Sequence, residues 1–474
     1  MTLIMADAPV YNVSTPTGGD PLKVDANAQY VGVEWNYTYI ILCSFIVWLI
    51  IPGIGLLYSG LARRKSTLAL LFQAFMVVAV YVELFFETHS SIVLTRKYPR
   101  ITLQWIFWGY SLTYARDASP FIGTLRNFGL RGVMVAPSPG SADLPEIVFC
   151  FYQLLFCACT LLLGDCRLLP PSLLDLEQQR WLYNLPSLDF AGGGPVHIAS
   201  GWSALAYAFV LGKRKNIDCT SHAKPHNTSL VFLGTALIWF GWFGFNVCHT
   251  WRLDSQCCVR EMLAAFNTNT AACTGVLGWV LVDYIKHRGK FSVVGACEGA
   301  IAGLVGITPA AGFVSVWLAA VIGFLTSITC ALLQDINEWL HIDEGMDVFK
   351  LHGIGGMVGP FLTGIFASQS IAALDGVTEA TGGIDGNRVQ VGKQLAEVCA
   401  ISAYSFIVSC ILLYILKFIP GMQLRVHEEV EMVGLDRSQF IDEQIGERVL
   451  LDDLGGSSSS VLDGISVVGS QEKK

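Results

Sequence analysis

Two histidines lie inside apolar stretches of the sequence, where a titratable side chain is costly to place. His197 follows Asp189 within residues 188–201, and His352 lies within residues 346–356. Ionisable groups inside a bilayer usually face a cavity or one another, so each of these three residues is a candidate functional residue. A neutral imidazole has one donor and one acceptor nitrogen and titrates near neutral pH. Two adjacent histidines could therefore relay a proton.

Simpler interpretations exist for each of these residues. A single histidine in an apolar helix is more often a packed core or helix-contact residue than a functional one, whereas two in matching positions of two repeats favour the functional interpretation. Asp189 could serve as a helix N-cap as well. Glu298 is another acid within an apolar stretch. We interpret Glu298 as a helix contact and leave it outside the predicted site.

The composition is that of a membrane protein. Of 474 residues, 53% are hydrophobic and only 14% are charged, and the mean hydropathy is +0.52. Apolar runs long enough to cross a bilayer recur along most of the chain, which excludes an ordinary soluble domain. The net charge of −8 says little, because the acids concentrate in the tails. The 14 cysteines lack zinc-type spacing, so we interpret most of them as small core residues and expect no metal site.

The sequence predicts an all-α polytopic protein with three regions. These are an extracellular tail (1–36), a transmembrane domain (37–418) and a cytoplasmic tail (419–474). The predicted spans are 37–58, 67–82 (interrupted and resumed at 103–110), 145–164, 190–211, 230–247, 263–285, 291–308, 311–333, 349–367 and 395–418. Glycine, alanine and serine are frequent in them, which allows neighbouring helices to approach closely.

The distribution of basic residues conflicts with this number of spans. Basic clusters follow residues 61, 212 and 286, and such clusters usually mark the cytoplasmic side. Only three clear spans separate the first two clusters, which would place them on opposite sides of the membrane. Residues 165–188 are rich in charge and proline and contain too few apolar residues for a span. One crossing is therefore missing there.

Several motifs together resemble the ammonium transporter, methylammonium permease and Rhesus family, and its fungal branch in particular. They occur in the family's order along nearly the whole chain. The motifs are PGIGLLYSG (52–60), FWGYS (107–111), DFAGG through His197 (189–197), WFGFN (242–246), ITPAAG (307–312), DVF with His352-Gly353 (347–353) and IPG (419–421).

This resemblance implies a homotrimer in the plasma membrane, with the amino terminus outside and the carboxyl terminus in the cytoplasm. Each protomer would have eleven helices, the first ten forming two inverted five-helix repeats, and its own pore for ammonium or methylammonium. The resemblance implies neither an enzyme activity nor a cofactor, a metal or a nucleic-acid partner. By position, Phe156 and Phe245 match the outer gate, His197 and His352 the twin histidines, and Asp189 the support of the recruitment site.

The chemistry of ammonium agrees with such a pore. Ammonium and potassium are close in size, so a filter cannot separate them by radius. Aromatic faces attract either cation by roughly 0.5–2 kcal/mol each. An apolar constriction then excludes an ion that must stay charged, whereas ammonium can release its proton and cross as ammonia. Selectivity for ammonium over potassium would therefore come from the ability of ammonium to lose a proton.

Three departures from the family pattern stand out. Residues 81–102 interrupt the second helix, and the fourth helix is absent together with the tryptophan of the outer cage. After Asn246, the small residues and the serine of the family are replaced, and His249 stands near the serine position. One explanation is mis-spliced or mis-predicted exon borders, in which case the chain as written would be a defective product.

The tail contains Ser457, Ser458, Ser459 and Ser460 beside acidic residues. A disordered linker is one interpretation, and a segment phosphorylated by a kinase to gate the pore is the other. Three alternatives to transport of ammonium with a proton remain open. They are an ammonium sensor with transporter architecture, a neutral gas channel, and a haem protein using His197 and His352 as axial ligands.

Overall fold

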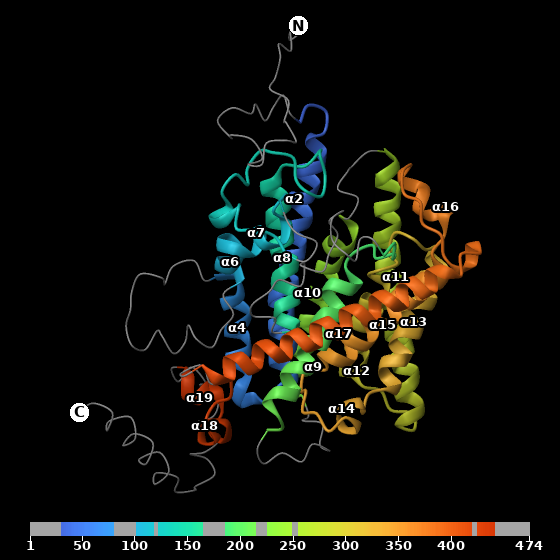
Figure 1. The fold of residues 1–474 in the computed structure, drawn as a ribbon. Coiled ribbons are helices and arrows are strands. Elements are labelled where there is room, and N and C mark those ends of the chain that lie inside the picture. Colours follow the sequence, from blue (N-terminus) through green and yellow to red (C-terminus); the bar gives the residue numbers. More distant parts are fainter. Residues whose placement is uncertain are drawn as a thin grey trace, which may run out of the picture.

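The structure is a computed structural model that describes residues 30–79, 101–117, 122–164, 185–214, 225–248, 255–419 and 424–440. The regular elements in these ranges are all helical, and one isolated bridge joins Pro137 to Pro145. Figure 1 shows the helices gathered into one bundle. The interruption at 81–102 falls almost wholly outside these ranges, as do most of the missing-span segment and all four tail serines.

The first half of the bundle contains the first predicted spans. Its elements are α2 (Glu34–Trp48), α3 (Ile50–Leu61), η1 (Arg64–Ser66), α4 (Thr67–Ala79), α6 (Ile101–Gln104), η2 (Trp105–Gly109), α7 (Tyr110–Tyr114), η3 (Phe128–Leu130), α8 (Glu146–Gly164), η5 (Gly193–Ile198) and α9 (Ala199–Leu211). Helices α2 and α3 form one span, and α4 with α6–α7 flanks the interruption. The predicted spans at 145–164 and 190–211 are confirmed as helical.

The second half follows the same order as its predicted spans. Its elements are α10 (Thr228–Val247), α11 (Ser255–Lys286), α12 (Val293–Ile307), α13 (Val316–Leu332), α14 (Ile336–Trp339), η6 (Phe349–Ile354), α15 (Gly355–Phe366), α16 (Gln369–Ala372), η7 (Ala373–Asp375), η8 (Gly383–Asp385), α17 (Val389–Phe418), α18 (Glu428–Val433) and α19 (Leu435–Gln439). Helix α13 begins later than predicted because a turn follows Pro309. Helix α17 begins earlier, and Gln390 and Gln394 in its polar first turns are buried.

Length and hydropathy identify the helices that can cross a bilayer. Within the described ranges, three are long and apolar enough on their own: 34–61, 228–247 and 389–418. A fourth candidate joins Phe349–Phe366 to Gln369–Asp375 through a bend of 98°. The other apolar helices are shorter or are broken by turns. Large apolar side chains such as Trp35, Phe232 and Ile411 are exposed on the outer faces of α2, α10 and α17, which suits contact with lipid or another protomer.

The packing places the histidine-bearing segments in the interior. Helix α11 lies against both α12 and α13, α10 against α3, and α17 against α9. Among the described residues, five free cysteines are buried as core residues (Cys150, Cys157, Cys159, Cys297 and Cys330), whereas Cys258, Cys273 and Cys399 are exposed. Cys43 and Cys248 differ, because they form a disulfide that joins α2 to the end of α10. No pattern in the sequence indicates this pair, since 205 positions separate the two residues.

Candidate pore and histidine pair

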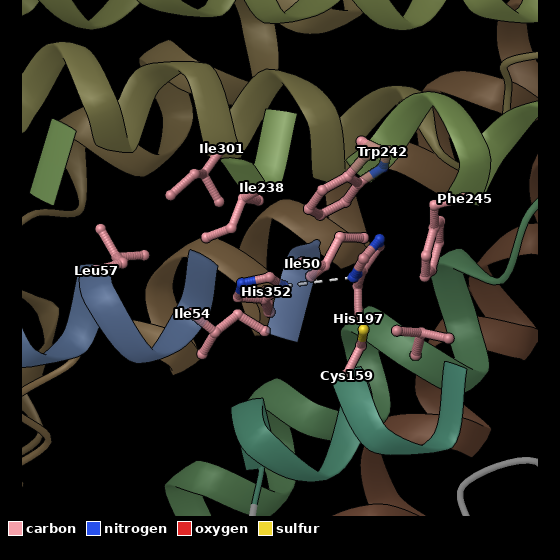
Figure 2. Close-up of a pocket in the computed structure, with 11 residues that line it drawn as sticks. Ile50, Ile54, Leu57, Cys159, His197, Ile238, Trp242, Phe245, Ile301 and His352 are labelled. Atoms are coloured by element: carbon pink, nitrogen blue, oxygen red, sulfur yellow. Dashed lines mark hydrogen bonds between the residues drawn. The ribbon is translucent and has the colours of Figure 1, made fainter. Parts of the chain in front are cut away.

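The two predicted histidines meet in the interior of the bundle. His352 Nδ1 lies 3.3 Å from His197 Nδ1, and the side chains are 4% and 1% exposed. Figure 2 shows the two rings facing each other across this contact. The hydrogen bond requires one imidazole to donate and the other to accept. The prediction that the two residues form a pair is therefore supported by geometry.

Both histidines lie on π-helical turns that continue into α-helices. His197 is on η5, which runs into α9, and His352 is on η6, which runs into α15. These turns approach closely because Gly201 faces the backbone of Gly353. A Cβ atom on Gly201 would lie only 2.1 Å from the amide nitrogen of Gly353. Glycine at position 201 is thus a condition for the contact between the histidines.

An apolar cavity surrounds the pair. It is lined by His197 and His352 and by side chains of α3, α8, η5, α10 and α12: Ile50, Ile54, Leu57, Cys159, Val196, Ile238, Trp242, Phe245 and Ile301 (Figure 2). A charged ion in such a cavity loses its hydration without gaining comparable partners. The cavity therefore admits a neutral molecule more readily than a cation.

Thr308 connects His197 to Trp242. The Thr308 hydroxyl lies 2.8 Å from the Leu304 carbonyl and donates to it. Trp242 Nε1 donates to Thr308 Oγ1 at 3.0 Å, and His197 Nε2 lies 3.2 Å from the same oxygen. With its hydrogen on Leu304, Thr308 accepts from both rings, so His197 carries its proton on Nε2. His197 Nδ1 then accepts from His352, which leaves the lone pair of His352 on Nε2.

The two predicted gate residues are stacked on one side of the pair. The rings of Phe156 and Phe245 have centroids 4.1 Å apart and an interplanar angle of 20°. Phe245 also lies 5.8 Å from the His197 ring. The Tyr152 hydroxyl donates to the Gly244 carbonyl at 2.9 Å, which joins α8 to α10 beside the stack. The stack therefore lies beside the His197 ring.

Asp189 fixes the backbone that leads into η5. Its carboxylate accepts three backbone N–H groups, from Gly192 at 3.0 Å, Gly193 at 2.7 Å and Gly194 at 2.7 Å. Three such bonds occupy most of its acceptor capacity. Asp189 therefore shapes the turn that leads to His197.

The loop before η6 is held by charged residues on the side of the bundle where α14, α18 and α19 lie (Figure 1). Arg214 Nε donates to Asp343 at 2.8 Å. Burial alone would raise the pKa of Asp343, but the hydrogen bonds and charge of Arg214 lower it overall. The Glu344 carboxylate accepts from the Met346 amide at 2.8 Å and the Phe349 amide at 3.3 Å, which fixes the start of η6.

Two further groups in the site were not predicted as site residues, although they lie in the motifs. Thr308 is in the ITPAAG motif and Trp242 in the WFGFN motif. Their roles depend on hydrogen bonds between α10, η5 and the end of α12, which no spacing within one helix reveals. Lys350, two residues before His352, was not predicted as a site residue either. It pairs with Glu298, which the sequence pattern places outside the predicted site. The histidine at position 249 lies outside the described residues.

Comparison with known proteins agrees with this geometry. The model of the Ammonium Transporter Family matches residues 38–168 and 160–445, so the boundary between the matches falls beside the segment where a span is missing. Ammonium transporter 1 of Schizosaccharomyces pombe is 41% identical over 90% of this chain and 86% of its own length. Ammonium transporter MEP2 of Saccharomyces cerevisiae is 40% identical over 90% of this chain and 85% of its own.

Solved structures show the same fold. The crystal structure of Candida albicans Mep2 superposes with a TM-score of 0.75 at 40% identity, covering 88% of this chain and 90% of that one. The crystal structure of Saccharomyces cerevisiae Mep2 also gives a TM-score of 0.75, at 38% identity over 88% of this chain and 92% of that one. The chain belongs to the ammonium transporter family and is a membrane protein with the all-α fold of its fungal members.

Proposed function

We propose that this chain transports ammonium across the plasma membrane, as ammonia and a proton, through a pore within each protomer. The observation that carries the proposal is the His197–His352 contact of 3.3 Å inside an apolar cavity. Two imidazoles in hydrogen-bond contact can pass a proton, and the apolar walls can pass ammonia. Together they would reject potassium, which cannot lose its charge.

The stacked rings of Phe156 and Phe245 serve as the outer gate in this proposal. Aromatic faces attract a cation, and the stack separates the cation from the cavity until the rings move. Ammonium waiting at the gate would lose its proton when ammonia passes the rings. Asp189 favours a cation there without binding it directly, because three backbone amides occupy its carboxylate.

The hydrogen-bond chain at Thr308 provides a route for the proton. The pair has a second arrangement, in which His197 carries its proton on Nδ1, His352 carries its proton on Nε2, and the Thr308 hydroxyl hydrogen turns from the Leu304 carbonyl to the free His197 Nε2. A proton that binds His197 Nε2 lets the Nδ1 proton pass to His352 Nδ1, and the His352 Nε2 proton leaves. The pair can then accept a proton at one end and release it at the other. The proton recombines with ammonia on the inner side, so the ammonium that leaves has the same composition as the ammonium that entered.

We further propose a homotrimer with the amino terminus outside and a regulatory cytoplasmic tail. The basic cluster after residue 61, one span away from the amino terminus, supports this orientation. Asp436 of the tail accepts from the amides of Leu68 and Ala69 at 3.0 and 2.9 Å, so α19 caps α4. Phosphorylation of Ser457–Ser460 by a kinase would add charge to this tail.

Growth on low ammonium tests the proposed function. The full chain is expressed in a cell that lacks its own ammonium uptake, together with a version in which a relative's segment replaces residues 165–184. Rescue by the chain itself, with uptake of labelled methylammonium, is the expected result. Rescue by the second version alone would keep the family assignment and identify this chain as a defective product. If neither version rescues growth although both reach the cell surface, the result would favour an ammonium sensor over a transporter.

A further inference from the structure

A buried lysine lies next to the pore and takes no part in the mechanism above. Lys350 is on η6, two residues before His352, and its side chain is only 1% exposed. Its Nζ lies 3.1 Å from Asp347 Oδ2 and 3.4 Å from Glu298 Oε2. The ring of Trp279 lies 5.2 Å from the same nitrogen. We call Lys350, Glu298 and Asp347 the inner triad.

The inner triad joins the turn of His352 to three helices. Glu298 is on α12 and Trp279 is on α11. The Lys350 ammonium group forms an ion pair with Glu298 and lies over the ring of Trp279. From α13, the Cys330 thiol donates to the Lys350 carbonyl at 3.4 Å. A single residue therefore contacts α11, α12 and α13. Because a buried charge is costly unless paired, this residue is strongly constrained in position.

The start of η6 needs such a constraint. Asp347 has a φ of +57°, in the left-handed region that non-glycine residues rarely adopt. The ion pair from Lys350 to Asp347 spans this residue and the first turn after it. On α12, Glu298 belongs to the triad, and Ile301 one turn later lines the pore cavity. Movement of the triad would thus shift both His352 and a wall of the cavity.

We propose that Lys350 is a positioning residue of the pore, whose ion pairs with Glu298 and Asp347 hold the turn of His352 against His197. The inference rests on the proposed transport function, since it concerns the same histidine pair. Lys350 acts through the backbone of η6, and His352 remains the group that contacts the proton. The positive charge of Lys350, paired with two carboxylates, is the feature that holds the turn in place.

Three variants of the full chain separate positioning from packing. Lys350→Met alone leaves Glu298 buried without its partner and is expected to reduce the amount of folded protein. The double variant E298M/K350M removes both charges and keeps apolar volume, so the fold is expected to survive. The swap E298K/K350E keeps one lysine with two carboxylates. Lys286→Met is the matched control, since it removes the exposed Lys286–Asp335 pair, whose atoms lie 2.9 Å apart.

Uptake of labelled methylammonium is compared at equal surface expression. E298M/K350M is expected to lower the maximal rate about tenfold or more, because misplacing a reacting group is costly. Its half-saturating concentration should stay near that of the parent chain, because the outer gate is untouched. The swap should recover most of the rate, and K286M should match the parent. An unchanged rate in E298M/K350M would overturn the inference.

A second measurement does not depend on transport. A structure of the E298M/K350M trimer by electron cryomicroscopy is expected to show His352 displaced from His197. An unchanged contact between the rings would overturn the inference even if the parent chain transports ammonium. Absence of uptake by the parent chain would instead contradict the proposed function, and the displaced ring would still support the role of the inner triad.

Discussion

His197 and His352 both lie on π-helical turns that continue into α-helices, but different interactions hold the two turns. On η5, the Asp189 carboxylate binds three backbone amides, and Thr308 binds the His197 ring. On η6, a buried lysine pairs with two carboxylates from α12 and from the start of the turn. The first turn is held by hydrogen bonds to a carboxylate and a hydroxyl, whereas the second is held by ion pairs.

Similar turns can therefore be stabilised either by hydrogen bonds to backbone amides and a hydroxyl or by buried ion pairs. Around His197, three consecutive glycines let the backbone wrap one carboxylate. Around His352, Lys350 pairs with Glu298 of α12 and with Asp347 just before the turn. Substitutions near η5 should therefore act mainly through steric fit and hydrogen bonding, and those near η6 through uncompensated charge.

The largest effect is expected where the two turns touch. In Gly201→Ala, the new Cβ would lie 2.1 Å from the Gly353 amide nitrogen, so the turns must separate. Uptake of methylammonium should be lost. Gly392→Ala is the matched control, because a Cβ there meets no atom within 4 Å. Uptake by G201A equal to that of G392A would contradict the described contact.

Removing one member of the pair should have the next largest effect. His352→Leu keeps apolar volume but breaks the relay, and proton transfer by a positioned group contributes about 10²–10⁴-fold. We expect the initial rate of uptake to fall by at least the lower of these factors. His287→Asn is the control, since its side chain is 47% exposed at the end of α11. Equal rates in both variants would show that the pair does not carry the proton.

A smaller effect is expected from the neutral support of His197. Thr308→Val removes the oxygen that binds both His197 and Trp242, while Thr308→Ser retains it. A hydrogen bond contributes about 0.5–1.5 kcal/mol, so the rate should fall up to about tenfold in T308V. T308S should keep most of the rate. If the two variants behave alike, the hydroxyl does not set the tautomer of His197.

The smallest effect is expected at the gate. Phe156→Leu keeps an apolar side chain but loses the stack with Phe245, which is worth about 0.5–1.5 kcal/mol. Selectivity for ammonium over potassium should decrease by a few fold, as measured by competition between the two ions during uptake. The opposite change, sharper selectivity in F156L, would show that the stack is not the discriminating barrier.

Much of this architecture could be predicted from the sequence. Apolar runs predicted most of the helices, although α11 begins at Ser255, well before the predicted span 263–285. The family resemblance assigned both histidines, both phenylalanines and Asp189 to one site. The sequence could not show Thr308 linking His197 to Trp242, because three separate segments make that contact. Glu298 was treated as a helix contact, and its partner Lys350 lies 52 residues away. Pairing across helices depends on tertiary packing, as does the Cys43–Cys248 disulfide.

Current recorded from the purified chain in liposomes tests whether the histidine pair carries a proton alongside ammonia. An ammonium pulse should produce a saturable current carried by the proton that accompanies ammonia, and a potassium pulse should produce none. The same ammonium pulse should give no current with H352L. Equal currents for ammonium and potassium, or an undiminished current in H352L, would contradict transport through a histidine relay.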